Sequence, residues 1–224
     1  MDIYGLVRGP LVWVAFIVFV LGLIYQAQQF LSSTREREVV LPPASLLGGV
    51  ELPKPLSLAD ISSSFLGVHP VITVVTTIFH VFLIMLPIFV LGHNVLFEES
   101  FGFSLFVFPE MVADVLTLIV ILGGVFFFLR RILIRRVRAI TTLYDYIIVA
   151  IVVVPFVTGY LATQQLLNYE TILILHILAG ELMLMAIPFT KLKHGLLFFL
   201  YRYQMNYENC LGSGSRVWSY NQAK

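Results

Sequence analysis

Five histidines are the side chains of this sequence best suited to chemistry. They all lie in or beside two apolar stretches, and they are His69, His80, His93, His176 and His194. An ionisable side chain inside a membrane is costly, and its presence is a functional hypothesis by default. Imidazoles that project from facing helices of a bundle are typical ligands of haem iron. The clustering therefore predicts b-type haem, with histidines from two helices facing each other across the iron.

In the later apolar stretch, His176 and His194 are 18 residues apart. That spacing is five whole turns at about 100° per residue, so both side chains share one face if the helix continues. For His176, which lies in wholly apolar sequence, the competing interpretation is a structural histidine bonded to a neighbouring helix. For His194, which follows Lys191 and Lys193, the competing interpretation is an interfacial cation.

The earlier stretch leaves two histidine pairs open. His80 and His93 would lie about 140° out of phase and about 20 Å apart on an ideal helix. Pro87 lies between them, and a kink or local unwinding at this proline would re-aim one of them. His69 and His80 are only about 20° out of phase, so helix geometry alone prefers that pair. His69 precedes Pro70, which also fits an interfacial residue at a helix start.

Composition places these histidines in a membrane protein. The chain is 59% hydrophobic and 12% charged, whereas a soluble domain is about 45–50% apolar and about 25% charged. We expect an all-α membrane protein with one five-helix domain over residues 1–200, which includes a cytoplasmic loop at 29–68, and a cytoplasmic tail at 201–224. The five stretches of near-bilayer length are residues 10–28, 69–96, 109–129, 144–163 and 171–188.

Lysines and arginines predict the orientation of these spans. Five arginines fall within residues 130–143, whereas residues 97–108 and 164–170 contain neither lysine nor arginine. Positive residues collect in cytoplasmic loops. An N-terminus on the outside leaves Arg8 as the one outer residue among 14 lysines and arginines. We therefore expect an outside N-terminus and a cytoplasmic C-terminus. The net charge of +1 does not indicate a nucleic-acid partner.

Four cations are candidate contacts for haem propionates, which need cations or hydrogen-bond donors. They lie at the cytoplasmic ends of the third and fifth stretches, and they are Arg130, Arg131, Lys191 and Lys193. The alternative is that all four are ordinary positive-inside anchors.

Two of the carboxylates within the apolar stretches stand out by their position. Glu181 falls near the middle of the fifth stretch, where it would relay protons or pair with a neighbouring hydroxyl or the haem edge. Asp145 begins the fourth stretch, and we expect it to pair with a nearby arginine such as Arg138 in a structural role.

A single cysteine, Cys210, limits the redox chemistry of the chain. One cysteine cannot form the C-x-x-C-H site of covalent haem or hold an iron–sulfur cluster. Electrons would therefore leave through another protein. The proline-rich loop at residues 35–64 and the tail at 201–224 are expected on one side, where they would form a docking surface for a cytoplasmic partner or be two flexible segments.

Several segments resemble the gamma subunit of respiratory nitrate reductases. The segments that carry the resemblance are residues 136–145, 158–161, 175–180 and 187–194, together with Phe79-His80 and Gly92-His93. The resemblance implies a five-helix cytochrome b that holds two b haems. It implies that His80 pairs with His194 around an inner haem, and that His93 pairs with His176 around an outer haem.

Departures from that subunit point to its relatives. The spacing of His80 and His93 is wider than in nitrate reductase subunits, and the proline-rich loop also differs. That loop and residues 94–104 look more like the cytochrome b subunits of the Dsr, Tmc and heterodisulfide reductase complexes of sulfate reducers and methanogens. The resemblance implies an electron-transfer subunit, without catalytic residues of its own, in the cytoplasmic (inner) membrane of a prokaryote. It would link menaquinone, exchanged near His93 and His176, to a cytoplasmic iron–sulfur subunit similar to heterodisulfide reductase.

Three alternatives to this function stay open. The chain would be a nitrate reductase gamma subunit, a haem-bearing subunit that takes electrons from a periplasmic multihaem cytochrome c, or a haem-free membrane anchor. The last leaves the intramembrane histidines unexplained.

Overall fold

The computed structural model describes residues 3–35, 69–195 and 197–198, and these residues are helical without any strand. Five helical segments are long and apolar enough to cross a membrane, so the chain is a multi-pass membrane protein and the predicted all-α class is confirmed. The helices are α1 (Ile3–Leu6), η1 (Val7–Leu11), α2 (Val12–Arg35), α5 (Pro70–Phe89), α6 (Leu91–Phe101), α7 (Glu110–Leu133), α8 (Arg135–Arg138), α9 (Leu143–Thr163), α10 (Tyr169–Phe189) and η3 (Lys191–Lys193).

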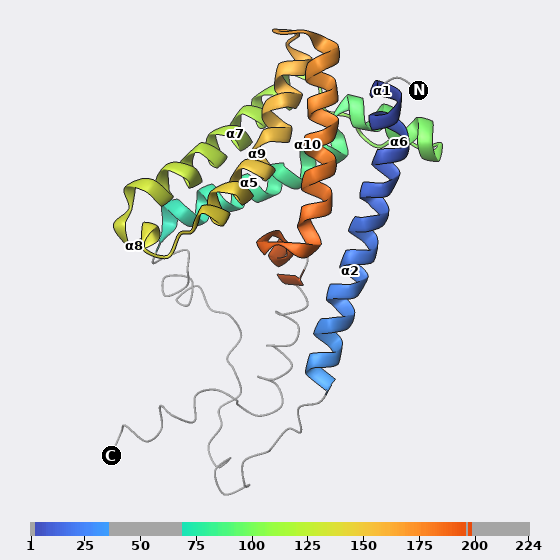
Figure 1. Cartoon of the computed structure of the whole chain (residues 1–224). Helices are drawn as coiled ribbons and strands as arrows, with labels where there is room; N and C mark the ends of the chain where they lie inside the picture. The colour runs from blue at the N-terminus through green and yellow to red at the C-terminus, as the bar shows by residue number, and fades with distance from the viewer. Residues whose placement is uncertain (1–2, 36–68, 196, 199–224) are drawn as a thin grey trace, which may run out of the picture.

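The helices pack in the order α5, α7, α9, α10 and α2, each against the next (Figure 1). Helices α1 and α6 and the loop between α9 and α10 lie at one end of the bundle, which we call the α6 end. The opposite end, which we call the α8 end, carries α8, the start of α5 and η3. Helix α2 continues to Arg35, beyond the expected boundary at residue 28. The rest of the predicted loop and the predicted tail lie outside the described residues.

The second span, expected over residues 69–96, is broken into the helices α5 and α6, and the break follows Pro87, where the sequence left a kink or local unwinding open. Pro87 cannot donate a backbone hydrogen bond, and Val90 is extended, with φ −77° and ψ 140°. Asn94, which is 2% exposed, closes the break. Its amide donates to the carbonyls of Ile88 (2.8 Å) and Val90 (3.1 Å), and its Oδ1 accepts the Leu105 N–H at 2.7 Å. These bonds tie the end of α5 to the start of α6 and to the loop that follows α6.

The fifth span ends before His194. Helix α10 stops at Phe189, and Thr190 is extended before the short turn η3. Helix α2 supports this end of α10 through Gly22, where a Cβ would lie 2.6 Å from Cγ of Pro188. The amide of buried Gln26 donates to the Pro188 carbonyl at 2.8 Å. A small residue therefore allows two helix backbones to approach at the point where the chain turns towards His194.

Candidate functional site

The four histidines of the resemblance form two separate pairs. His80 on α5 and His194 after η3 have ring centroids 5.9 Å apart and ring planes at 81°. His93 on α6 and His176 on α10 also have centroids 5.9 Å apart, with planes at 14°. The pair of His80 and His194 lies towards the α8 end, and the other pair lies towards the α6 end. The structure thus brings together the partners that the resemblance implies.

Each of the four histidine rings is held by a hydrogen bond from its Nδ1 atom to a backbone carbonyl. The Nδ1 atom of each lies 2.6–2.9 Å from a carbonyl oxygen; the carbonyls are those of Thr76 for His80, Pro87 for His93, Pro155 for His176 and Lys191 for His194. A carbonyl only accepts, so Nδ1 carries the proton and Nε2 keeps its lone pair. None of the hydrogen bonds among the described residues uses an Nε2 atom of these four rings. This is the tautomer that binds metal through Nε2.

The broken second span explains how His80 and His93 serve different partners. On one ideal helix they would diverge by about 140°. The break at Val90 places them on two helices, and the Pro87 carbonyl beside the break accepts from His93 at 2.8 Å. His69 precedes the first residue of α5, is exposed, and lines a cavity with Arg130. Among the described residues, His80 and His93 each belong to one histidine pair, and His69 belongs to neither.

Helix α9 builds a seat for the ring of His176. The Pro155 carbonyl accepts from His176 at 2.9 Å, and the Thr158 hydroxyl oxygen lies 3.3 Å from the same Nδ1. A Cβ on Gly159 would lie only 2.9 Å from Cε1 of the His176 ring. The sequence Thr158-Gly159 thus leaves space for an imidazole that any larger residue would displace.

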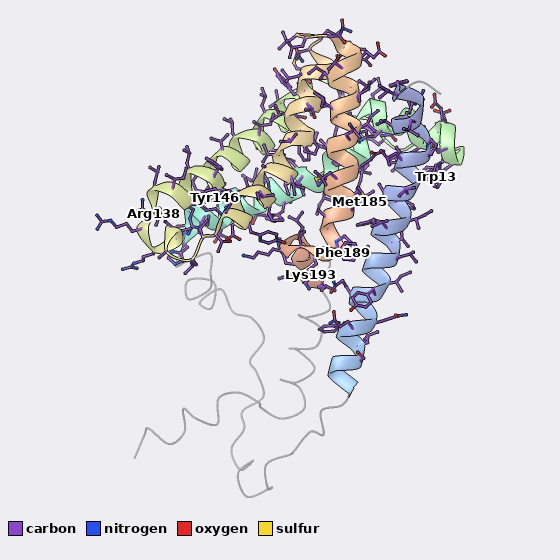
Figure 2. All side chains as sticks on the ribbon, in the orientation of Figure 1. Trp13, Arg138, Tyr146, Met185, Phe189 and Lys193 are labelled. Atoms are coloured by element: carbon purple, nitrogen blue, oxygen red, sulfur yellow. The ribbon has the colours of Figure 1, made fainter. Side chains whose placement is uncertain are left out.

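An ion pair between buried Asp145 and exposed Lys191 fixes the segment that carries His194. Asp145 accepts from Lys191 Nζ at 2.5 Å, and from the backbone N–H and the hydroxyl of Thr142 at 2.8 and 2.9 Å. Thr142 and Asp145 form the capping box that begins α9. The Lys191 carbonyl in turn accepts from His194 Nδ1 at 2.6 Å. The predicted partner of Asp145 was wrong, because Lys191 takes this place and Arg138 lies exposed at the far edge of the bundle (Figure 2).

Replacing Asp145 with asparagine is expected to weaken cofactor binding at the His80 and His194 pair by up to about 10-fold, the lower end of the range for losing a group that bonds a ligating histidine directly, because Asp145 acts on His194 through Lys191. The change removes the charge that holds Lys191 and leaves the side-chain volume nearly unchanged. The measurement is the cofactor content of purified protein as free cofactor is titrated. Glu99→Gln is the matched control, since it breaks the ion pair with Arg8 at the α6 end. Equal affinity in the Asp145 variant and wild type would contradict this role.

The four predicted propionate cations have different surroundings. Arg131 donates to the Phe127 carbonyl of its own helix at 3.1 Å. The Nζ atom of Lys193 lies 3.4 Å from the Gln26 side-chain oxygen, and Lys191 forms an ion pair with Asp145. Arg130 lines the cavity beside His69. Their contact with propionates stays a prediction.

Glu181 is buried in α10 without the hydroxyl partner considered from sequence. It is 6% exposed, and its Oε1 has no hydrogen-bond partner within the described part of the chain. The proton relay and the contact with a haem edge stay predictions.

Sites with three or more protein ligands do not occur in the described parts of the chain, where no group of three His, Cys, Asp or Glu residues could hold a metal ion. Pairs of histidines are a different case. Haem iron receives its equatorial nitrogens from the macrocycle and needs only two axial ligands from protein. The chemistry of the donor set therefore fits haem.

Comparison with known proteins identifies one relative of almost the same length. A protein of Nitratidesulfovibrio vulgaris is 38% identical over 215 residues, which cover 94% of this chain and 95% of that protein. No protein-family model matches the chain, and no solved structure matches it. Identity at this level over nearly the whole of both chains establishes common ancestry. The chain therefore belongs to the same family as this N. vulgaris protein.

Proposed function

We propose that the chain is a dihaem b-type cytochrome, the membrane subunit of an anaerobic respiratory complex. It carries electrons between menaquinone and a cytoplasmic iron–sulfur subunit similar to heterodisulfide reductase. The observation that carries the proposal is the arrangement of four histidines in two pairs, every one with Nδ1 on a backbone carbonyl and Nε2 available. Isolated structural histidines have no reason to share one tautomer and to meet in pairs.

The spacing within each pair supports two-sided ligation. Imidazoles that bind one metal from opposite sides, each through a metal–nitrogen bond of about 2 Å, have ring centroids roughly 6 Å apart. Both pairs have centroids 5.9 Å apart. His80 and His194 would hold one haem, and His93 and His176 would hold the other.

Bound haem supplies one-electron transfer, because two histidines leave the iron without an open position for substrate chemistry. The residues of the chain hold and orient the group. Carbonyl oxygens on Nδ1 fix the ring orientation and make each imidazole more basic, which strengthens ligation. The two pairs lie towards opposite ends of the bundle, so together they would form a path for electrons across the membrane.

Quinone exchange is proposed beside His93 and His176, which would be the outer pair. Residues 97–108 and 164–170 would form its rim. Glu98, Glu99 or Glu170 would accept protons released by quinol, and Glu99 contacts Arg8 there. Electrons would then pass inward to the pair of His80 and His194. The proposed outside position of the N-terminus makes the pair of His93 and His176 the outer one, because α1 lies at the same end of the bundle as α6.

The test is a reduced-minus-oxidised absorption spectrum of the purified full chain, with haem and protein quantified on the same sample. We expect b-haem bands and about two haems per chain, one per histidine pair. A spectrum without these bands would support the haem-free membrane anchor and overturn the proposal. A ratio near one would overturn the two-haem interpretation alone.

A further inference from the structure

A groove between α5 and α7 lies at the α8 end, and none of the four paired histidines lines it. Its volume is about 610 Å³, within the range of about 300–1,000 Å³ that is typical of small-molecule sites. We call it the α5–α7 groove. The residues that matter for its chemistry are His69, Val71, Phe126, Leu129, Arg130 and Leu133.

The wall of the α5–α7 groove is apolar and faces outward from the bundle. Val71 is 67% exposed and Leu133 is 72% exposed. On a membrane-spanning helix such side chains face hydrocarbon. The groove therefore suits a ligand with an acyl chain that lies along the bundle surface.

The end of the same groove carries positive charge that no ion pair among the described residues compensates. Arg130 lines the groove and begins a run of five arginines within residues 130–138. The two ion pairs among the described residues are those of Arg8 with Glu99 and Lys191 with Asp145, so neither engages this run. The Arg130 guanidinium also has no hydrogen bond within the part of the chain that the structure describes. The charge complement of this end is an anion.

We infer that the α5–α7 groove binds an anionic phospholipid. The acyl chain would lie along Val71 and Leu133, and the phosphate would face Arg130. Basic pockets between membrane helices are known to select such headgroups. Inorganic phosphate would leave the apolar wall unused, and the neutral head of a quinone would not require a cluster of arginines. The inference does not depend on the proposed haem function.

The experiment measures lipid retention by the full chain in neutral detergent, using native mass spectrometry after incubation with phosphatidylglycerol or phosphatidylcholine. We expect Arg130→Gln to weaken phosphatidylglycerol binding about fivefold, the effect of one arginine near an anionic lipid surface. Arg131→Gln is the matched control, because the neighbouring Arg131 is bonded to its own helix and does not line the groove. It should change binding less than twofold.

A second variant removes the space and keeps the charge. Leu133→Trp should reduce phosphatidylglycerol retention by filling the α5–α7 groove, with an unchanged elution volume as evidence of folding. Equal retention of the two lipids would overturn the inference, and so would equal effects of Arg130→Gln and Arg131→Gln. Displacement of the lipid by inorganic phosphate or by a soluble menaquinone analogue would assign the groove to that ligand instead.

Discussion

A His176→Ala variant is expected to lose one b haem and to keep the other. The ring centroids of His176 and His93 lie 5.9 Å apart. Replacing His176 with alanine therefore leaves the haem of this pair with His93 as its one protein ligand. The other pair uses different elements, α5 and the segment after η3, and is not touched by the change. Haem per chain should therefore fall from about two to about one. The measurement is haem quantitation with the low-spin signals counted by electron paramagnetic resonance.

Three companion variants separate the possible ligand sets. His194→Ala should remove the other haem, and the double variant of His176 and His194 should remove both. His69→Ala should retain both haems, because the structure places His69 at the start of α5 and outside either pair. Loss of a haem in His69→Ala would support His69 as a ligand in place of its neighbours. Retention of both haems in His176→Ala would contradict the proposed site.

Hydrophobicity and length were enough to locate the five spans, because a membrane helix must be long and apolar whatever its neighbours are. The ends of the spans were harder to place. Pro87 signals a disturbance in the second span, but it does not say where the helix resumes. That position depends on Asn94, whose side chain contacts Leu105 in the loop that follows α6. Such a contact between distant residues has no signature in hydrophobic periodicity.

The spacing of His176 and His194 singled out two residues that each belong to a histidine pair, although they do not lie on one continuous helix. The five-turn argument assumed a continuous helix, whereas α10 ends at Phe189 and the chain turns through η3. His194 still reaches His80 because Asp145 holds Lys191 and Lys191 holds His194. Charge pattern alone could not choose Lys191 over Arg138 as the partner of Asp145. That choice is made by the packing of α9 against α10.

The backbone acceptors of the rings were also beyond sequence reasoning. His176 bonds to the Pro155 carbonyl on another helix, and nothing in the spacing of these residues predicts the contact. Gly159 was visible only as part of the resemblance. A glycine inside an apolar span can have many roles. At Gly159 the role is to leave room for the His176 ring, which packs where a Cβ would lie.

Replacing Gly159 with alanine is expected to disturb the His93 and His176 pair without touching α5 or η3. The new Cβ would lie 2.9 Å from Cε1 and 3.2 Å from Nδ1 of His176, so the ring must move. Movement would stretch the 2.9 Å bond to the Pro155 carbonyl and rotate Nε2 away from the iron. Because the Pro155 carbonyl holds the His176 ring in the orientation needed to bind iron, we expect haem affinity at this pair to fall by about 10- to 100-fold.

Gly180→Ala is the matched control for this change. Gly180 lies in α10 itself, four residues after His176, and a Cβ there meets nothing within 4 Å. Both variants add one methyl group to a membrane-spanning helix, so a general effect of alanine on folding would appear in both. The measurement is a redox titration of each purified variant, with the two haems resolved by their midpoint potentials. We expect one component to shift or disappear in Gly159→Ala and both to persist in Gly180→Ala. If the two variants titrate identically, the space at Gly159 does not position His176.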